Sequence, residues 1–131
     1  MTFRFEFDPV NKILLTRIEG RLTDELFAEP LRAFWKYWAA TDASASIVDF
    51  SSVAEFALSS SFIRGLANRQ GGGELNARPR VIVAPADLVF GLSRMYQILG
   101  ERKQPNVKVV RTLDAALVEL GAESPHFEPL D

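Results

Sequence analysis

The sequence predicts one α/β domain, with a mixed, mostly parallel five-stranded sheet and an N-terminal antiparallel hairpin, in the order β-β-α-β-α-β-α-β-α. Short apolar runs alternate with amphipathic stretches over most of the chain, which is typical of a parallel sheet covered by helices on both faces. Two adjacent strand-like segments at the start predict the hairpin. The length of 131 residues fits a single domain. We expect the domain to span residues 1–121 and residues 122–131 to form a peripheral tail.

Five segments have the composition of strands. Residues 3–7 place Phe at every second position between charged residues, which is the period of a half-buried strand. A turn sequence at residues 8–11 separates this segment from a second strand at residues 13–18, which Gly20 ends. The other predicted strands are continuous apolar runs at residues 46–50, 81–84 and 107–110.

Four helices are expected between and after these strands. Thr23, Asp87 and Thr112 are suited to cap three of them, and the remaining helix begins near the serines at positions 59–61. Glycines at positions 100 and 121 follow the last two helices and predict where they end.

The first helix contains a proline and two tryptophans. Pro30 interrupts the helical pattern, so we expect either a kink or a new helix that starts at this residue. Trp35 and Trp38 share the apolar face, which predicts that they belong to the core rather than to a stacking platform for sugars or bases.

Composition excludes several classes of function. The formal net charge is −2 and no run of like charge reaches five residues, so we expect no nucleic-acid partner. The absence of Cys excludes disulfides, thiol catalysis and thiolate metal sites, and it fits a reducing compartment. No stretch approaches the ~18–20 apolar residues of a membrane-spanning helix. We expect a cytoplasmic protein with no cofactor, no metal and no integral membrane segment.

Three stretches carry a resemblance to a known family. Residues 47–53 (Ile-Val-Asp-Phe-Ser-Ser-Val) are similar to the strand and the Asp-Leu-Ser-x-Val motif of the STAS domain. Residues 81–85 and 91–96 resemble a subgroup of small stand-alone members, and residues 113–117 resemble the closing helix of the family. The resemblance covers residues 3–121. It implies the fold of the anti-sigma-factor antagonists (the SpoIIAA-like superfamily) and a regulatory role through protein partners.

The chain departs from this family at the phosphoacceptor. Antagonists of the family are phosphorylated on a Ser within Asp-Ser-Ser-Gly at the start of the second helix. Counting from Asp49 without a gap, these Asp and Ser positions fall on Ala57 and Leu58. A small shift brings Ser59 or Ser60 to the position, but the preceding Asp and the following Gly stay absent. We therefore do not carry the phosphorylation over to this chain.

The same serines are candidates for a ligand site. Ser59, Ser60 and Ser61 lie where a helix N-terminus binds phosphate, with Arg64 as the nearest cation in sequence. Such a site needs free backbone N–H groups and a cation close to them. Ordinary helix capping explains the same serines equally directly, and we favour it.

Other polar residues are better explained without a catalytic role. The glycines at positions 71–73 follow a helix and precede a strand, so we expect a connector rather than a phosphate loop. His126 is the sole His and lies in the tail, where we expect it to be exposed. Asp49 and Ser51 follow a central strand, where a general base would lie, but Asp commonly accepts backbone N–H bonds in such turns. No second carboxylate accompanies Asp49, and we expect no enzyme.

The helix after Asp87 suggests an interface. One face is predicted to be buried and consists of Leu88, Leu92, Met95 and Leu99. Phe90 falls on the opposite, polar face together with Arg94 and Gln97, and an aromatic residue beside an Arg is typical of an interface anchor. The alternative, an isolated apolar residue on the surface, is normal in soluble proteins. We predict that these three residues mediate contact with a second copy of the chain, in a homo-oligomer such as a dimer, or with another protein.

Two functions are compatible with these observations. The first is a non-catalytic, STAS-like interaction or regulatory module, which should show a filled core and an exposed patch around Phe90. The alternative is a carrier or sensor of a small apolar or amphipathic, lipid-like ligand, because the fold is also similar to that of CRAL-TRIO domains. Such a protein should show an apolar pocket near the helix that begins at Ser59 or the one that begins at Asp87.

Overall fold

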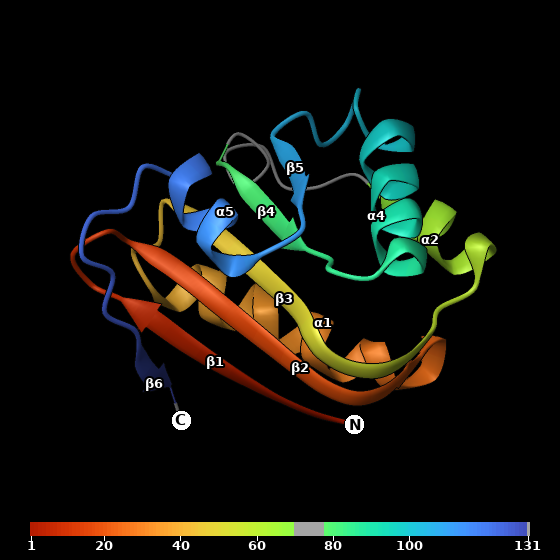
Figure 1. Cartoon of the computed structure of the whole chain (residues 1–131), viewed down its shortest axis with the longest axis horizontal. Coiled ribbons are helices and arrows are strands. Elements are labelled where there is room, and N and C mark those ends of the chain that lie inside the picture. The colour runs from red at the N-terminus through yellow and green to blue at the C-terminus, as the bar shows by residue number, and fades with distance from the viewer. Residues whose placement is uncertain (70–77, 131) are drawn as a thin grey trace.

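The computed structural model describes residues 1–69 and 78–130, so the connector predicted at residues 71–73 lies outside the described residues. The described part forms one mixed sheet with the strand order β5-β4-β3-β2-β1-β6 (Figure 1). Its strands are β1 (Thr2–Asp8), β2 (Ile13–Thr23), β3 (Ala45–Ala57), β4 (Arg80–Val83), β5 (Val107–Val110) and β6 (Glu128–Leu130). Its helices are α1 (Asp24–Ala40), α2 (Ser60–Ala67), α4 (Asp87–Leu99) and α5 (Leu113–Glu119).

The predicted fold class is confirmed. Strands β1 and β2 form the antiparallel hairpin, and β2, β3, β4 and β5 are parallel neighbours. The prediction of five strands is wrong by one, because residues 128–130 of the expected tail pair antiparallel with β1. This strand is only three residues long and contains Pro129, so neither periodicity nor propensity marks it in the sequence.

Strands β2 and β3 extend well beyond their predicted ends and curve together toward α1 and α2 (Figure 1). Gly20 does not end the second strand. It lies inside β2 with a φ of 87°, next to register shifts between the two strands, a conformation that a residue without a Cβ adopts freely. Asp49 consequently lies within β3 rather than in a turn after it. Its Oδ1 accepts the Ser51 N–H at 2.9 Å, beside one of these shifts.

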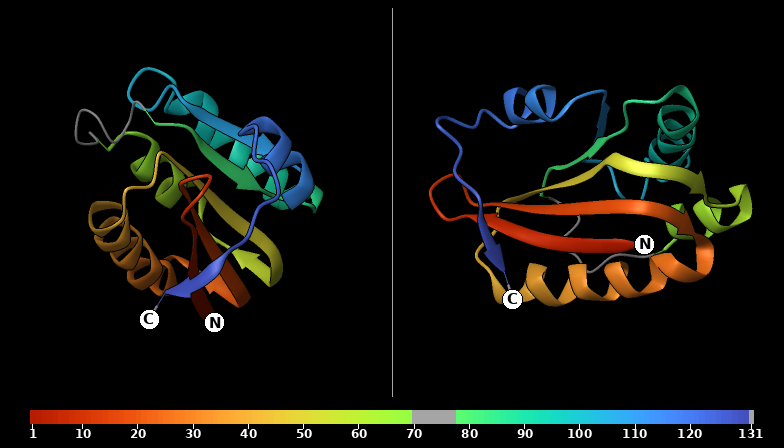
Figure 2. Two further views of the ribbon diagram at one scale, coloured as in Figure 1. Left: turned by 90° about the vertical axis from the view of Figure 1, so that its left-hand side faces the viewer. Right: turned by 60° about the horizontal axis from the view of Figure 1, so that its bottom comes forward.

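The helices cover both faces of the sheet, with α5 on the opposite side from α1 (Figure 2). The alternation of side chains along β2 explains this arrangement. Ile13 and Leu15 belong to the cluster that packs against α5, whereas Leu14 packs against Trp38 of α1. Helices α2 and α4 share the α1 face, since Ile18 clusters with side chains from both of them. No helix within the described residues is both long enough and apolar enough to cross a membrane.

Local capping signals fix the starts of most helices. The side chains of Thr23, Ser59 and Thr112 accept the N–H of the third residue after them, as predicted for N-caps. Asp87 is not a cap. It is the first residue of α4, the N-cap is Ala86, and the Asp87 carboxylate pairs with Arg111 instead.

Helix α1 runs unbroken through Pro30, so the predicted alternative of a new helix starting at this proline is wrong. Trp38 is fully buried in the core, as predicted. Trp35 is half-buried and faces the cavity described below.

The predicted buried face of α4 is wrong by about a quarter turn. Leu88 and Leu99 are exposed, whereas Val89 and Ser93 are buried. Small residues occupy the true packing face because α4 lies close to α2. A Cβ added at Gly100, which follows α4, would lie only 3.3 Å from the carbonyl oxygen of Ala67 in α2.

Candidate functional site

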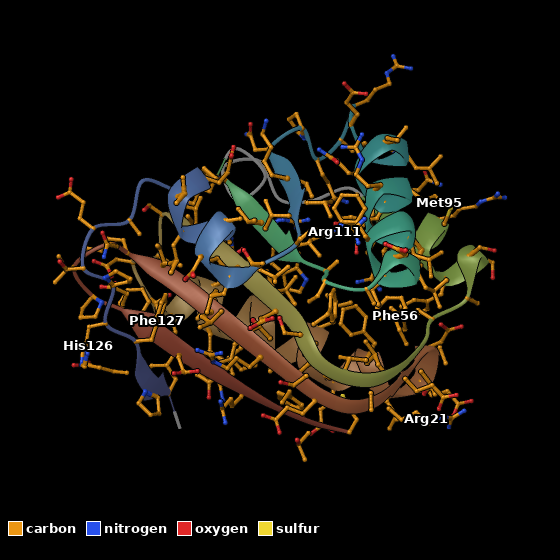
Figure 3. The ribbon with its side chains drawn as sticks, in the orientation of Figure 1. Arg21, Phe56, Met95, Arg111, His126 and Phe127 are labelled. Atoms are coloured by element: carbon orange, nitrogen blue, oxygen red, sulfur yellow. The ribbon has the colours of Figure 1, made fainter. Side chains whose placement is uncertain are left out.

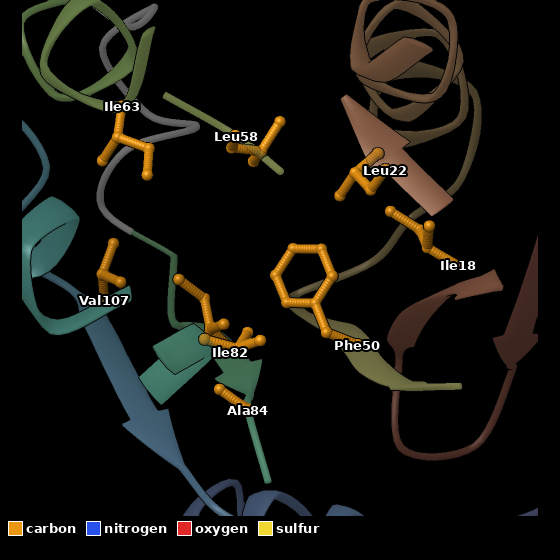
Figure 4. Close-up of a cluster of buried hydrophobic side chains, with 9 residues drawn as sticks. Ile18, Leu22, Phe50, Leu58, Ile63, Ile82, Ala84 and Val107 are labelled. Atoms are coloured by element: carbon orange, nitrogen blue, oxygen red, sulfur yellow. The ribbon is translucent and has the colours of Figure 1, made fainter. Parts of the chain in front are cut away.

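An apolar cavity of about 370 Å³ lies between the sheet and the helices α1, α2 and α4. Most small-molecule sites have volumes of about 300–1,000 Å³, so this cavity is large enough to hold a ligand. Its walls come from all three helices and from the strands β2 to β5. Figure 4 shows a part of this wall, in which Phe50 and Ile82 reach from the sheet and Ile63 from α2.

Helix α1 packs on the sheet near both of its ends, and the cavity lies between these contacts. Near its start, the Phe27 ring packs against Phe50 and Phe62, with centroid distances of 6.5 Å and 6.1 Å. Near its end, Trp38 packs into the cluster around Leu14. Between these contacts the floor of the cavity is made of small side chains on β2 and β3. These are Thr16, Ser46 and Val48.

The cavity also contains a connected polar group. Arg80, at the start of β4, donates from Nη2 to the Tyr96 hydroxyl at 2.5 Å and to Gln104 Oε1 at 2.7 Å. The Tyr96 hydroxyl is also hydrogen-bonded to Gln104 Oε1. Gln104 Nε2 in turn donates to the Leu66 carbonyl of α2 at 3.0 Å, so the polar group is fixed to the helix framework.

Thr16 is the other polar feature of the cavity. The side chain is buried, and its hydroxyl makes no hydrogen bond with any described residue. Buried hydroxyls usually have a partner, so an unpaired one in the wall of a cavity marks a place where a ligand or a water can bind.

The serines predicted as a ligand site do not line this cavity. Ser59 caps α2, and its backbone N–H and hydroxyl both donate to the Asp24 carboxylate, at 2.8 Å and 2.7 Å. This negative charge occupies the position where a phosphate would meet the helix N-terminus, and it would repel one. Ser60, Ser61 and Arg64 are exposed. A phosphate site at these residues remains a prediction, and Asp24 argues against it.

The three residues predicted as an interface lie together on α4, but two of them face the body of the molecule. Phe90 is half-buried, with the Arg111 guanidinium 3.9 Å above its ring centroid. Gln97 Nε2 donates to the Val107 carbonyl at 2.8 Å, and its Oε1 accepts from the exposed Arg94. In Figure 3, Arg111 lies on the α5 side of α4 and Met95 on the side nearer α2. Their role in an interface remains a prediction.

The remaining candidates have structural partners. Asp49 forms an ion pair with Arg17, with Oδ2 and Nη1 3.5 Å apart, in addition to its bond from Ser51. His126 is exposed, as predicted, and its backbone N–H donates to Asp8. No cluster of three or more potential metal ligands occurs among the described residues.

Comparisons with known proteins bear on the fold. No family model matches this sequence, and no curated protein matches it either. Among solved structures, the chain is similar to the anti-sigma factor antagonist SpoIIAA in its unphosphorylated form. The TM-score is 0.60 with 16% sequence identity, and the match covers 94% of this chain and 100% of that chain. The fold is SpoIIAA-like. The resemblance found in residues 3–121 is thus confirmed for the fold. At 16% sequence identity, the similarity shows the fold alone.

Within this SpoIIAA-like fold, the sequence analysis missed the residues of the cavity. Tyr96 and Gln104 follow Arg80 by 16 and 24 positions in the sequence, so no local spacing links the three residues. One signal was available. Thr16 and Ser46 are polar residues on a strand face that otherwise carries apolar side chains, among them Ile18 and Phe50.

Proposed function

We propose that the chain is a non-catalytic module that binds a small apolar or amphipathic ligand in the cavity beneath α1, α2 and α4. The observation that carries this proposal is the cavity itself, about 370 Å³ with mainly apolar walls. Its volume lies in the range of small-molecule sites, and the cavity is open to solvent on one side, so a ligand can enter it. Its place beside α2 and α4 is the one expected for a ligand carrier or sensor.

A substitution that fills the cavity tests this proposal. Val48 lies on the cavity floor and is half-buried, so Val48→Phe places a ring in the empty volume. We expect this variant to be at least as stable as the wild type, because the ring gains contacts without displacing neighbours. Its affinity for 1-dodecanol, measured by calorimetric titration below the solubility limit, should fall strongly.

Val118→Phe is the matched control, since Val118 is exposed on α5, on the other side of the sheet. It should bind 1-dodecanol as the wild type does. Equal binding by the wild type and the Val48→Phe variant would mean that the alcohol does not enter the cavity, and it would refute the proposal.

A second candidate function, an interaction module, is supported by the outer face of α4. Leu88 and Ile98 are 62% and 59% exposed there, and Leu99 is also exposed. The fold supports this candidate too, because the similar solved structure is an anti-sigma factor antagonist. We propose self-association through this face, with the exposed Arg94 at its edge. Phe90 and Gln97, which the sequence analysis placed in the same interface, face the body of the molecule.

The oligomeric state tests this second candidate. Light scattering of the wild type should give a dimer, and the Leu88→Glu and Ile98→Glu variants should be monomeric and folded. Val118→Glu, a charge on an exposed residue of α5, should leave the dimer intact. A monomeric wild type would rule out self-association and leave the ligand proposal unaffected.

A further inference from the structure

We propose that the ligand of this cavity is an amphipathic anion, such as a fatty acid, whose carboxylate pairs with Arg80. This inference rests on the proposed function, because it names the chemistry of a ligand in the same cavity. It follows from one cation without an acidic partner, one hydroxyl without a hydrogen bond, and a wall that is otherwise apolar.

Arg80 has no counter-ion among the described residues. Its neighbours at hydrogen-bond distance are the oxygens of Tyr96 and Gln104, both neutral groups. Arg17, by contrast, is half-buried in the same sheet and pairs with Glu6 and Asp49. A guanidinium partly removed from water is costly without an opposite charge nearby. An anionic ligand supplies that charge.

The polar network also orients Arg80 for such a ligand. A guanidinium has five N–H donors, and the two bonds seen here both come from Nη2. The donors on Nε and Nη1 make no hydrogen bond with a described residue. Tyr96 and Gln104 therefore hold the group from one side and leave donors for a carboxylate on the other, and guanidinium–carboxylate bonds are among the strongest in proteins.

Polar side chains also occur on the cavity floor. Ser46 on β3 is paired in register with Arg80 on β4, whereas Thr16 on β2 is paired with Val48, two residues farther along β3. The unpaired Thr16 hydroxyl faces the same cavity. A ligand head group on Arg80 thus has the Ser46 side chain beside it, and Thr16 offers a further polar contact farther along the cavity.

The rest of the wall suits an alkyl chain. Phe27, Phe34 and Trp35 of α1 face Val48 and Ile82 of the sheet across the cavity. A sugar or a nucleotide would need hydrogen-bond partners along most of its surface, which this wall lacks. A cation with polar neighbours and an otherwise apolar wall match a molecule with one head group and one chain.

Two ligands of equal chain length test the proposal. Dissociation constants of dodecanoate and 1-dodecanol are measured by calorimetric titration for the wild type, Arg80→Met, Arg80→Lys and Arg94→Met. The wild type should bind dodecanoate about tenfold or more tightly than 1-dodecanol, the scale of one charge-assisted hydrogen bond. Arg80→Met should lose this preference while its affinity for 1-dodecanol is kept, which also shows that the variant is folded.

The other two variants are controls. Arg80→Lys keeps a positive charge and should retain part of the preference for dodecanoate. Arg94 is exposed on α4 outside the cavity, so Arg94→Met should behave like the wild type. A variant that fails to bind either compound is checked for folding by circular dichroism before its affinities are used.

Each negative result has a separate meaning. Equal affinities of the wild type for both compounds, or a preference that persists in Arg80→Met, would overturn the assignment of the head group and leave the cavity as a ligand site. No binding of either compound to the wild type would overturn the assignment together with the proposed function.

Discussion

Asp8 fastens the turn of the N-terminal hairpin to the C-terminal segment. Its carboxylate accepts the backbone N–H of Val10, Asn11 and His126 and the side-chain amide of Asn11, at 2.7–3.1 Å. Burial by itself raises the pKa of Asp8, but these hydrogen bonds to the charged form outweigh burial and hold the pKa below its ordinary value of 3.8. The charged form is therefore the one that stabilises the fold.

This lowered pKa predicts how stability changes with pH. A carboxyl whose pKa is lower in the folded than in the unfolded state stabilises the fold above the unfolded value, and the contribution is lost as the pH falls through the folded pKa. Asp8→Asn should lower the free energy of unfolding at neutral pH by about 1–2 kcal/mol, because donors lose a charged acceptor. It should also lose less stability than the wild type between pH 5 and the acid range, measured by urea unfolding.

Asp42→Asn is the control for this prediction. Asp42 is exposed, and its hydrogen bond with Lys12 lowers its pKa as well. Exposed ion pairs contribute little to stability, so this variant should resemble the wild type at neutral pH. An Asp8→Asn variant as stable as Asp42→Asn would show that the anchoring of the C-terminal segment does not depend on the charge.

The role of a residue could be predicted from sequence where its hydrogen-bond partner is close to it in the chain. It could not be predicted where the partner is distant. Thr23, Ser59 and Thr112 cap helices through bonds to the third residue after them, and local sequence is enough to predict this. Arg80 depends on partners brought together by tertiary packing, and these left no local pattern. The Asp24 carboxylate at the start of α2 is likewise 35 positions away from Ser59.

At the scale of whole elements, α4 shows why helical periodicity misled. Apolar residues lie on more than one side of the helix, so Leu88, Leu92, Met95 and Leu99 make an apolar stripe although two of them are exposed. The helix packs through the small buried residues Val89 and Ser93, and Leu92 and Met95 from one part of the stripe pack beside them. Periodicity detects apolar residues but not the need for small ones.

The orientation of α4 predicts that substitutions at two neighbouring positions change the free energy of unfolding by very different amounts. Val89 is 6% exposed, and Val89→Ala removes two buried methyl groups, which should cost about 2 kcal/mol of unfolding free energy. Leu88→Ala should change it by less than about 0.5 kcal/mol, because the side chain is in solvent. Urea unfolding of both variants checks this, and the reverse order would mean that the helix packs through the stripe predicted from sequence.

The start of α2 predicts how the serines respond to charge. Ser59→Ala removes the N-cap and should cost about 1 kcal/mol of unfolding free energy. Ser59→Asp, although Asp is a good N-cap elsewhere, should be less stable than Ser59→Ala because it places a second carboxylate beside Asp24. In an Asp24→Asn background this penalty should disappear. Thermal unfolding compares the variants, and a stabilising Ser59→Asp would contradict the electrostatic argument.

For the molecule as a whole, the order of apolar runs and helices was enough to predict the strands β1 to β5, because each of them pairs with the strand before or after it in the sequence. It did not predict β6, which pairs with β1 from the other end of the chain. The cavity was not predictable in this way. Ten Phe and two Trp could fill a core or line a hollow, and composition does not separate the two. The cavity depends on tertiary packing, in which Phe27 and Trp38 of α1 meet the sheet on either side of it.

The pairing of β6 with β1 has a consequence for synthesis on the ribosome. The N-terminal strand carries Phe at positions 3, 5 and 7, and, among the described residues, 128–130 alone pair with its outer edge, at residues 5–7. While a nascent chain lacks these residues, an aromatic-rich edge has unsatisfied backbone groups, the usual starting point for aggregation. Translation that stalls or terminates shortly before residue 128 should therefore yield a nearly complete domain that needs chaperones to stay in solution.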